Sequence, residues 1–359
     1  LLSLLNMPVF NPNPASSLPQ NDDLLSNDLQ PAPIDLDKPD EPALSAPVDD
    51  PLVAEVPAAA PEPVELPAFD QAPAPAAPEG TGVFDNVEGL SAEEKIDPNR
   101  IQINIQDREA PIVVLYGPPS CGKTMTLVRL TRYLKRNGYQ VSPVRSLRPS
   151  DDHHYKDLCN GFNDMINSID AARSTDNMSF MLVAVSKEGR RICQILEAPG
   201  EGYFYHGAQG ERYPKFLNDM LALDMRKIYC VIVEPDGQSE QLRNEYVDRL
   251  AHLKHTHMGA RDSVIFVFNK IDLTNFVYGR GRVHLSPARK EVAQLYPGIF
   301  APFRNENPIT RFWREWNCEF VPFQTGSYTR DAAGGLVFSD GPDEYPHKLW
   351  KTILKCCRG

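Results

Sequence analysis

Apolar and polar residues alternate in blocks along the chain from about residue 100 onward. Compact apolar runs, which are typical of buried strands, occupy residues 112–116, 180–185, 191–196, 228–233, 264–268 and 320–323. Between them, apolar residues recur at helical spacing over 124–137, 151–171, 214–224, 239–254, 286–296, 308–316 and 345–355. A strand-like stretch also lies at 141–146. Strands that alternate with helices predict an α/β fold, in which helices cover both faces of a mostly parallel sheet.

A hairpin and a helical insertion are expected to interrupt this regular alternation. The residues KEGR at 187–190 separate two apolar runs and indicate a β-hairpin turn, so we expect one antiparallel strand at an edge of the sheet. The insertion covers about 140–174. Its inward helix face is expected to carry His154, Leu158, Phe162, Met165, Ile166 and Ile169. The aromatic side chains expected in the core, or on a partner-binding surface if exposed, are Phe312, Trp313 and Trp316.

Acidic residues and prolines concentrate at the start of the chain. Residues 1–80 hold 14 acidic residues, one basic residue and 17 of the 33 prolines. Such a segment cannot bury enough apolar surface to offset the entropy that is lost on ordering it. We therefore expect a disordered Pro/Ala-rich acidic tail or linker over 1–99 and one folded domain over 100–359.

Charge and cysteine usage exclude several classes of protein. Beyond residue 80 the chain holds 34 acidic and 36 basic residues, and this near-neutral balance argues against a general nucleic-acid binder. No run of 18 apolar residues occurs, so we expect no membrane association. The seven cysteines lack metal-ligand spacing, which favours a reducing, cytoplasmic location.

A glycine-rich loop lies between the first predicted strand and the first predicted helix. Residues 117–124 read GPPSCGKT and match the pattern G-x-x-x-x-G-K-[ST]. Backbone N–H groups of such a loop bind phosphate together with the helix N-terminus. Lys123 would reach the terminal phosphates and Thr124 would bind Mg²⁺. The residues expected to line the phosphates are Gly117, Pro118, Pro119, Ser120, Cys121, Gly122, Lys123 and Thr124.

A second polar motif, NKID, directly follows the predicted strand at 264–268 and supplies Asn269, Lys270 and Asp272. A carboxylate just past a strand end can accept two hydrogen bonds, from the N1–H and the 2-amino group of guanine. Adenine offers no such pair of donors, so an unpaired carboxylate would penalise it. The motif therefore favours guanine recognition by Asp272.

With these motifs the chain resembles the Ras-like GTPases of the translation-factor-related P-loop class, over about residues 110–355. Thr175, EAPG at 197–200 and QTGS at 324–327 stand in the order of the other family motifs. The resemblance implies a three-layer P-loop NTPase fold that binds GTP or GDP. It also implies Mg²⁺ ligands at Thr124, Thr175 and Glu197, and contacts to the guanine oxygen from Thr325, Gly326 and Ser327.

The chain departs from the family pattern at two acidic positions. Glu197 replaces the usual Asp, and Glu201 stands where many members carry a glutamine that orients water. An ionised glutamate cannot donate a hydrogen bond, so slow hydrolysis, or another water-positioning residue, is expected. Larger relatives with a helical insert carry an arginine that acts in cis on the transition state. The resemblance implies this role for Arg173. The alternative is that Arg173 is a solvated loop residue.

Three functions are compatible with these motifs. The first is a GTP-hydrolysing switch for an unidentified protein effector or regulator, with its catalytic site formed by Lys123, Thr175, Gly200, Glu201 and Arg173. The second is a nucleotide-binding interaction module with little or no hydrolysis, and the third is a P-loop ATPase or kinase-like phosphotransferase. Cys121 is either a small filler residue or a reactive thiol whose pKa the helix N-terminus lowers.

Overall fold

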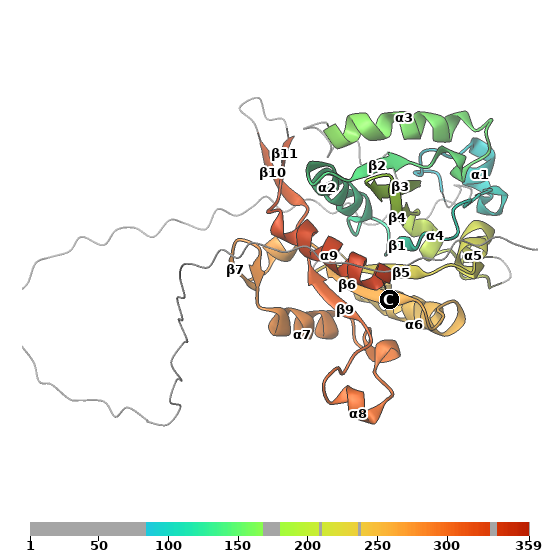
Figure 1. The fold of residues 1–359 in the computed structure, drawn as a ribbon. Helices are drawn as coiled ribbons and strands as arrows, with labels where there is room; N and C mark the ends of the chain where they lie inside the picture. Colours follow the sequence, from blue (N-terminus) through green and yellow to red (C-terminus); the bar gives the residue numbers. More distant parts are fainter. Residues whose placement is uncertain (1–83, 168–179, 208–209, 236–237, 331–335, 359) are drawn as a thin grey trace, which may run out of the picture. The chain divides into compact units, whose positions relative to one another are not determined.

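The computed structural model describes residues 84–167, 180–207, 210–235, 238–330 and 336–358. A seven-stranded sheet in the order β2-β3-β4-β1-β5-β6-β9 forms its centre (Figure 1). The strands are β1 Ile112–Tyr116, β2 Gln140–Pro143, β3 Met181–Lys187, β4 Arg190–Glu197, β5 Lys227–Val233, β6 Ser263–Phe268 and β9 Glu319–Pro322. Every residue of β1 and β5 is buried, as expected for apolar runs at the middle of a parallel sheet.

The strand directions confirm the prediction of a mostly parallel sheet. Strands β4, β1, β5, β6 and β9 pair in parallel, and β3 alone runs against both of its neighbours. β3 does not lie at the edge, because β2 pairs with its outer side through Val141 and Val185. The predicted hairpin joins β3 to β4, and its turn residues Glu188 and Gly189 have positive φ angles of 52° and 74°, as tight hairpin turns require.

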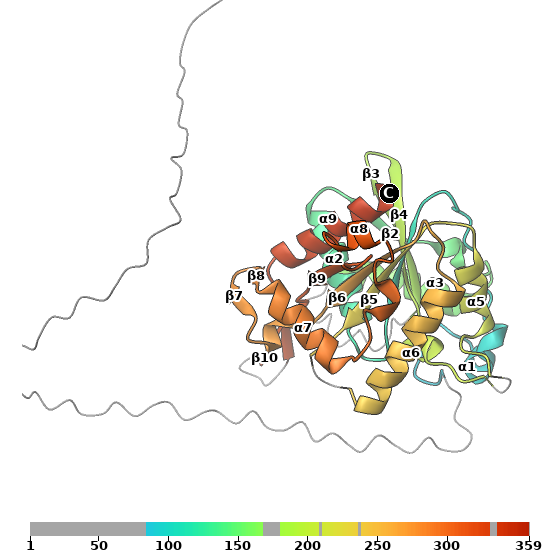
Figure 2. The same cartoon turned by 90° about the horizontal axis from the view of Figure 1, so that it is seen from below.

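Helices cover both faces of the sheet (Figures 1 and 2). On one face, α2 (Lys123–Arg136) and α9 (Glu344–Arg358) contact each other. The opposite face carries α4 Gly200–Tyr203, α5 Lys215–Ala222, α6 Glu240–Thr256 and α7 Leu285–Leu295. Helices α5, α6 and α7 lie between strands that run parallel to each other, so each belongs to a crossover connection. None of the described helices combines the length and the apolar character needed to cross a bilayer.

The helical insertion contains β2, the short 3₁₀ helix Arg145–Leu147 and α3 (His153–Asn167), which lies over the β2 edge (Figure 1). Tyr155 Oη donates to Val144 O at 3.1 Å, and Arg132 of α2 donates to Ile166 O at 2.8 Å. The inward face holds Tyr155 instead of the predicted His154, which is exposed. The other predicted residues of this face up to Ile166 are buried, and Ile169 lies outside the described residues.

The folded part begins earlier than predicted. Phe84, Val87 and Leu90 are buried, and they precede α1 (Ala92–Ile96) and the 3₁₀ helix Pro98–Arg100. Arg148 of the insertion fastens this segment, because it pairs with Glu94 and donates to Gln102 O at 2.8 Å. The assignment of residues 84–99 to the tail is therefore wrong: Phe84, Val87 and Leu90 anchor the segment, and a run of only three apolar residues is too short to predict an element from the sequence. Residues 1–83 lie outside the described part, so their disorder stays a prediction.

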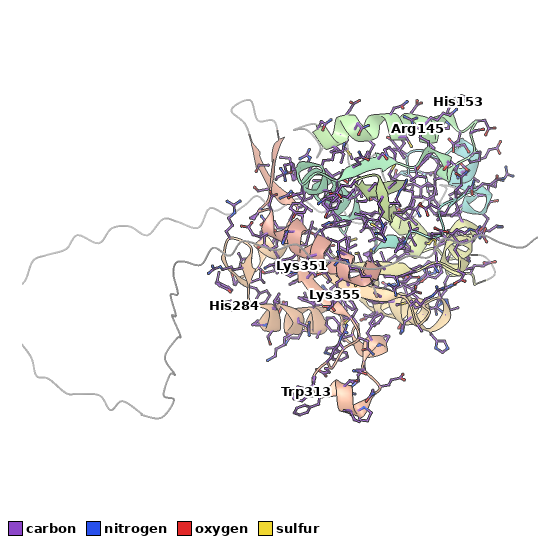
Figure 3. All side chains as sticks on the ribbon, viewed as in Figure 1. Arg145, His153, His284, Trp313, Lys351 and Lys355 are labelled. Atoms are coloured by element: carbon purple, nitrogen blue, oxygen red, sulfur yellow. The ribbon has the colours of Figure 1, made fainter. Side chains whose placement is uncertain are left out.

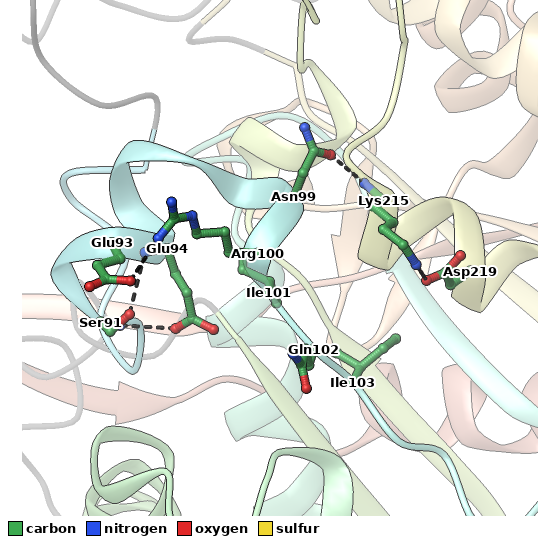
Figure 4. Close-up of a pocket in the computed structure, with 10 residues that line it drawn as sticks. All are labelled: Ser91, Glu93, Glu94, Asn99, Arg100, Ile101, Gln102, Ile103, Lys215 and Asp219. Carbon is green, nitrogen blue, oxygen red and sulfur yellow. Dashed lines mark hydrogen bonds and ion pairs between the residues drawn. The ribbon is translucent and has the colours of Figure 1, made fainter.

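A cavity of about 720 Å³ lies between this N-terminal segment and α5 (Figure 4). Its charged side chains are paired, as in Arg100 with Glu93 and Lys215 with Asp219. The backbone N–H of Lys215 donates to Asn99 Oδ1 at 2.9 Å. Polar contacts across this cavity therefore hold the N-terminal segment against α5.

The remaining elements follow β6 and β9. They are the 3₁₀ helices Ile271–Leu273 and Ala301–Phe303, β7 Val277–Gly279, β8 Arg282–Val283, α8 Pro308–Arg311, β10 Gly326–Arg330 and β11 Leu336–Asp340. The predicted helix at 308–316 is limited to the single turn of α8. Phe312 and Trp313 are 82% and 84% exposed, so the expectation that they belong to the core is wrong. Trp313 lies beside α8, at the bottom of the view in Figure 3. Trp316 packs against Phe300.

Candidate nucleotide-binding site

The glycine-rich loop leaves the carboxyl end of β1 and leads into α2. Gly122 is the N-cap of α2 and has a φ of +89°, a conformation that favours glycine. A Cβ atom at this position would lie 2.4 Å from Asn269 Nδ2. A side chain at residue 122 would therefore clash with the second motif, which explains the glycine physically.

Lys123 folds back over this loop. Its ammonium donates to Gly117 O at 3.1 Å and to Pro118 O at 2.8 Å, and the residue is only 5% exposed. The cation therefore lies directly above the curled backbone. This position suits contact with the outer phosphates of a nucleotide that sits in the loop.

Thr124 and Glu197 meet at the start of α2. Thr124 Oγ1 donates to Glu197 Oε1, while Glu197 Oε2 is buried without a hydrogen-bond partner among the described residues. Burial raises the pKa of the Glu197 carboxyl to about 8, against the opposing effects of Thr124 and Lys123. A hydroxyl and an unsatisfied carboxylate oxygen are ligands that Mg²⁺ prefers, so these two residues fit the predicted metal site. Thr175, the third predicted ligand, lies outside the described residues.

The EAPG motif touches the phosphate loop. A Cβ atom at Gly200 would lie 2.3 Å from Pro119 N and 2.6 Å from Pro118 C. Only glycine permits this approach, which places the backbone of Gly200 beside the loop, at the start of α4. Glu201 follows in the first turn of α4 and is half-buried. Arg173, the predicted arginine in cis, lies outside the described residues.

The NKID motif contacts the phosphate loop directly. Asn269 Nδ2 donates to Cys121 O at 3.2 Å, and Asn269 N donates to Val233 O at 2.8 Å. Lys270 has a φ of +53° and forms an ion pair with the buried Glu234. Glu234 follows β5 and was not singled out in the sequence, because nothing in its local pattern indicates that it meets Lys270.

Asp272 lies just beyond this contact, in the 3₁₀ helix Ile271–Leu273. Partial burial raises the pKa of its carboxyl, although much of the side chain is open to solvent. No other side chain among the described residues donates a hydrogen bond to it. The carboxylate is therefore available to a ligand.

The QTGS segment is tied to the NKID segment through backbone hydrogen bonds. Ile271 N donates to Phe323 O at 3.2 Å, and Phe323 N donates to Phe268 O at 2.8 Å. These bonds bring Thr325, Gly326 and Ser327 to the same edge of the sheet as Asp272. A Cβ atom at Gly326 would lie 2.2 Å from Ser339 O of β11, so the hairpin requires this glycine.

An arginine cluster on α2 fastens the β10–β11 hairpin. Arg129 donates to Gly341 O and to Asp343 Oδ1, both at 2.6 Å, and its side chain is fully buried. Arg132 and Arg136 donate to Asp340 at 2.9 and 3.0 Å. The helix that starts at the phosphate loop therefore also holds the QTGS segment. The sequence does not reveal this link, because it joins residues about 200 positions apart.

Cys121 is a filler residue in this arrangement. Its thiol is fully buried, and burial raises its pKa to about 11 although Lys123 opposes the shift. The expectation that the helix N-terminus lowers this pKa is therefore wrong, because loss of solvation outweighs the helix dipole.

No group of three or more His, Cys, Asp or Glu residues in the described part is arranged to hold a metal ion.

Comparison with known proteins adds little. No family model and no curated protein matches the chain. One similar solved structure is described as nucleolar GTP-binding protein 1 of Plasmodium falciparum, with 11% identity, a TM-score of 0.35, and coverage of 71% of this chain and 90% of that chain. Another is the S. cerevisiae Ski7 GTPase-like domain bound to GTP, with 13% identity, a TM-score of 0.33, and coverage of 75% and 53%. Scores this low carry no argument about the function of this chain.

Proposed function

We propose that this protein binds a guanine nucleotide with Mg²⁺ and hydrolyses GTP slowly as a molecular switch. The observation that carries the proposal is the hydrogen bond from Asn269 Nδ2 to Cys121 O. It joins the phosphate loop to the motif that contains Asp272, so a single nucleotide can reach both.

The phosphate side of the proposed site uses the backbone N–H groups of residues 117–124 and the N-terminus of α2. Lys123 supplies a positive charge above the loop. Thr124 and Glu197 would hold Mg²⁺, with Thr175 as a proposed third ligand. A bound Mg²⁺ would neutralise charge on the outer phosphates.

The base side uses Asp272 as the acceptor for the N1–H and 2-amino group of guanine. The backbone of Thr325, Gly326 and Ser327 is proposed to meet the guanine oxygen. An adenine ring would leave the carboxylate unpaired, which argues against the ATPase or kinase-like alternative.

Hydrolysis is proposed to rest on positioning, because phosphoryl transfer needs little covalent chemistry from the protein. Gly200 N–H would contact the terminal phosphate, and Arg173 is a proposed source of positive charge. Glu201, when ionised, cannot donate to the attacking water, and its charge opposes that of the phosphates. Turnover is therefore expected to be slow, and Glu201→Gln is expected to accelerate it.

A second function, a nucleotide-binding module with little turnover, is favoured by the anchoring of α4. Tyr203 is fully buried against Tyr116, with ring centroids 4.5 Å apart. Tyr246 adds to this cluster, because its single O–H lies within hydrogen-bonding distance of two carbonyl oxygens, Tyr116 O at 3.1 Å and Ile232 O at 3.0 Å. A switch that releases the segment after Gly200 would have to expose Tyr203. Such packing suits a bound nucleotide with a structural role.

Nucleotide identity tests the proposal. Freshly purified protein is denatured, and the released nucleotide is identified by chromatography, with Lys123→Ala as the control for phosphate binding. We expect GDP or GTP from the wild type and none from Lys123→Ala. Asp272→Asn is expected to shift the preference towards xanthine nucleotides, since its amide donates where the carboxylate accepts. Adenine nucleotides in the wild type would contradict the proposal.

Single-turnover GTP hydrolysis separates the two functions. A measurable rate that increases in Glu201→Gln supports the slow switch. No turnover, together with tight and stoichiometric GTP binding, supports the interaction module. Rapid turnover that Glu201→Gln slows would contradict the proposed inhibitory effect of Glu201.

A further inference from the structure

Four of the seven cysteines gather away from the candidate nucleotide site. Cys193 of β4 and Cys230 of β5 are buried, while Cys356 and Cys357 in the last turn of α9 are half-buried. All four are free thiols. The proposed nucleotide chemistry uses none of them.

The sheet register brings the end of α9 onto Cys193. Gln194 and Lys227 both pair with Ile112 of β1, so Cys193 lies level with Arg226. Arg226 donates to Cys356 O at 3.2 Å and to Cys357 O at 3.1 Å. The last turn of α9 is therefore fixed over the end of the sheet where Cys193 lies, close to β3 and β4 (Figure 2).

Cys357 lies beside the end of β4 and also reaches solvent. Arg191 and Ile192, which directly precede Cys193 in β4, line the same cavity as Cys357. The cavity has a volume of about 790 Å³, and its charged lining residues are the basic Lys187, Arg190, Arg191 and Arg358 and the acidic Asp107, Glu109 and Glu188. A small oxidant can reach Cys357 through this cavity.

The two thiols differ in acidity. The hydrogen bond with Cys193, together with the charges of Arg226 and Arg358, lowers the pKa of Cys357. The same hydrogen bond and complete burial raise the pKa of Cys193. Cys357 is therefore the more acidic of the two thiols. A half-buried thiol that reaches solvent, close to a second and less acidic cysteine, is typical of a redox-sensing pair.

We propose that Cys357 and Cys193 form a reversible disulfide when a hydroperoxide enters this cavity. The Cys357 thiolate attacks a peroxide oxygen, so that an S–O bond forms and the O–O bond breaks; the leaving oxygen takes up a proton. The Cys193 sulfur then attacks the sulfur of the resulting sulfenic acid. The S–S bond forms, the S–O bond breaks, and the hydroxyl leaves as water with the proton of Cys193. The two thiols lose two electrons in total, and the peroxide gains them.

The experiment maps thiols in the full-length wild-type chain. The protein is exposed to a small excess of hydrogen peroxide, its free thiols are alkylated, and the peptides are mapped by mass spectrometry without reduction. We expect a peptide pair that joins Cys193 to Cys357 and disappears on treatment with dithiothreitol. The matched control Cys356→Ser keeps this pair, because the neighbouring residue is not the one that reacts.

Two further variants test the order of the steps. In Cys193→Ser the sulfenic acid at Cys357 has no partner, so we expect it to accumulate and to be trapped by dimedone. In Cys357→Ser we expect Cys193 to stay reduced. The proposal is overturned if wild-type Cys357 reacts no faster than Cys318, if Cys357 pairs with another cysteine instead, or if folded wild-type protein keeps both thiols reduced. Because the wild-type map needs no substitution, the result does not depend on the folding of the variants.

Discussion

At the residue scale, buried polar groups define the candidate site. Glu197 is fully buried, and one of its carboxylate oxygens has no partner among the described residues. Its side chain is one methylene longer than the aspartate of the GTPase pattern, yet it reaches Thr124. An unsatisfied carboxylate at this depth is costly for a fold to keep, and binding of a cation would satisfy it.

The ionisation of Glu197 predicts a pH dependence of stability. Its pKa is about 8 in the folded chain and 4.5 without burial. The folded state therefore binds the extra proton, and the contribution of Glu197 to stability is fully present below pH 4.5 and is lost as the pH rises through about 8. We expect the free energy of unfolding without Mg²⁺ to fall across this range, as measured by urea titration. Glu197→Gln serves as the control, and an unchanged slope in this variant would assign the effect to other groups.

The contact between Gly200 and the phosphate loop gives a second prediction at this scale. A methyl group at residue 200 would meet the backbone of Pro119, so Gly200→Ala must push the two segments apart. We expect the affinity for a fluorescent guanine nucleotide to fall by about tenfold or more, since loss of one phosphate contact costs about 1.5–3 kcal/mol.

Gly161→Ala is the matched control for that substitution. Gly161 lies within α3 with no atom within 4 Å of its Cβ position. The change should leave nucleotide affinity unaltered and raise the free energy of unfolding by about 0.5–1 kcal/mol, because alanine is the better helix former. Equal affinities for both variants would show that Gly200 does not approach the ligand.

At the scale of elements, α2 connects the two halves of the candidate site. It begins at the phosphate loop, and its arginines hold Asp340 and Asp343 at the base of the β10–β11 hairpin. The hairpin in turn positions the QTGS segment. A displacement of α2 would therefore alter the phosphate side and the base side together.

Arg129 and Arg136 should contribute unequally to this link. Both contact Asp340 and Asp343, but the side chain of Arg129 is 0% exposed and that of Arg136 is 48% exposed. We expect Arg129→Ala to reduce the free energy of unfolding by about 2–5 kcal/mol, since it removes a fully buried side chain and leaves a cavity. Arg136→Ala should cost no more than about 1 kcal/mol. Chemical denaturation measures both, and similar losses would mean that burial does not set the strength of these ion pairs.

At the scale of the whole described domain, residues 84–100 pack against helices from two different parts of the chain. Phe84 is buried near Phe216 and Leu217 of α5, beside Gly202 in α4. Leu158 of α3 packs against Gly89. Residues 84–100 therefore connect the insertion with the helices that follow the EAPG motif.

Phe84→Ala tests this packing. We expect a loss of about 3–5 kcal/mol in the free energy of unfolding, because a large buried side chain leaves a cavity. Phe312→Ala is the control, since Phe312 is 82% exposed and surface substitutions usually change stability by no more than about 0.5 kcal/mol. A small loss in both variants would show that the side chain of Phe84 does not contribute to the core of the domain.

The sequence alone indicated the strands of the central sheet, the glycine-rich loop and the NKID motif, because buried strands and tight loops are local patterns that few residue types satisfy. It also indicated the hairpin and the parallel sheet. The tertiary structure decided which distant residues meet. It brings Asn269 to Cys121, the arginines of α2 to the β10–β11 hairpin, and the end of α9 to the strand that carries Cys193. It also decided that residues 84–99 belong to the folded domain. Burial is likewise a tertiary property. Desolvation raises the pKa of Cys121, where the sequence predicted a lower one. Phe312 and Trp313 are exposed, although the sequence predicted that they belong to the core. The spacing of residues along the chain indicates neither result.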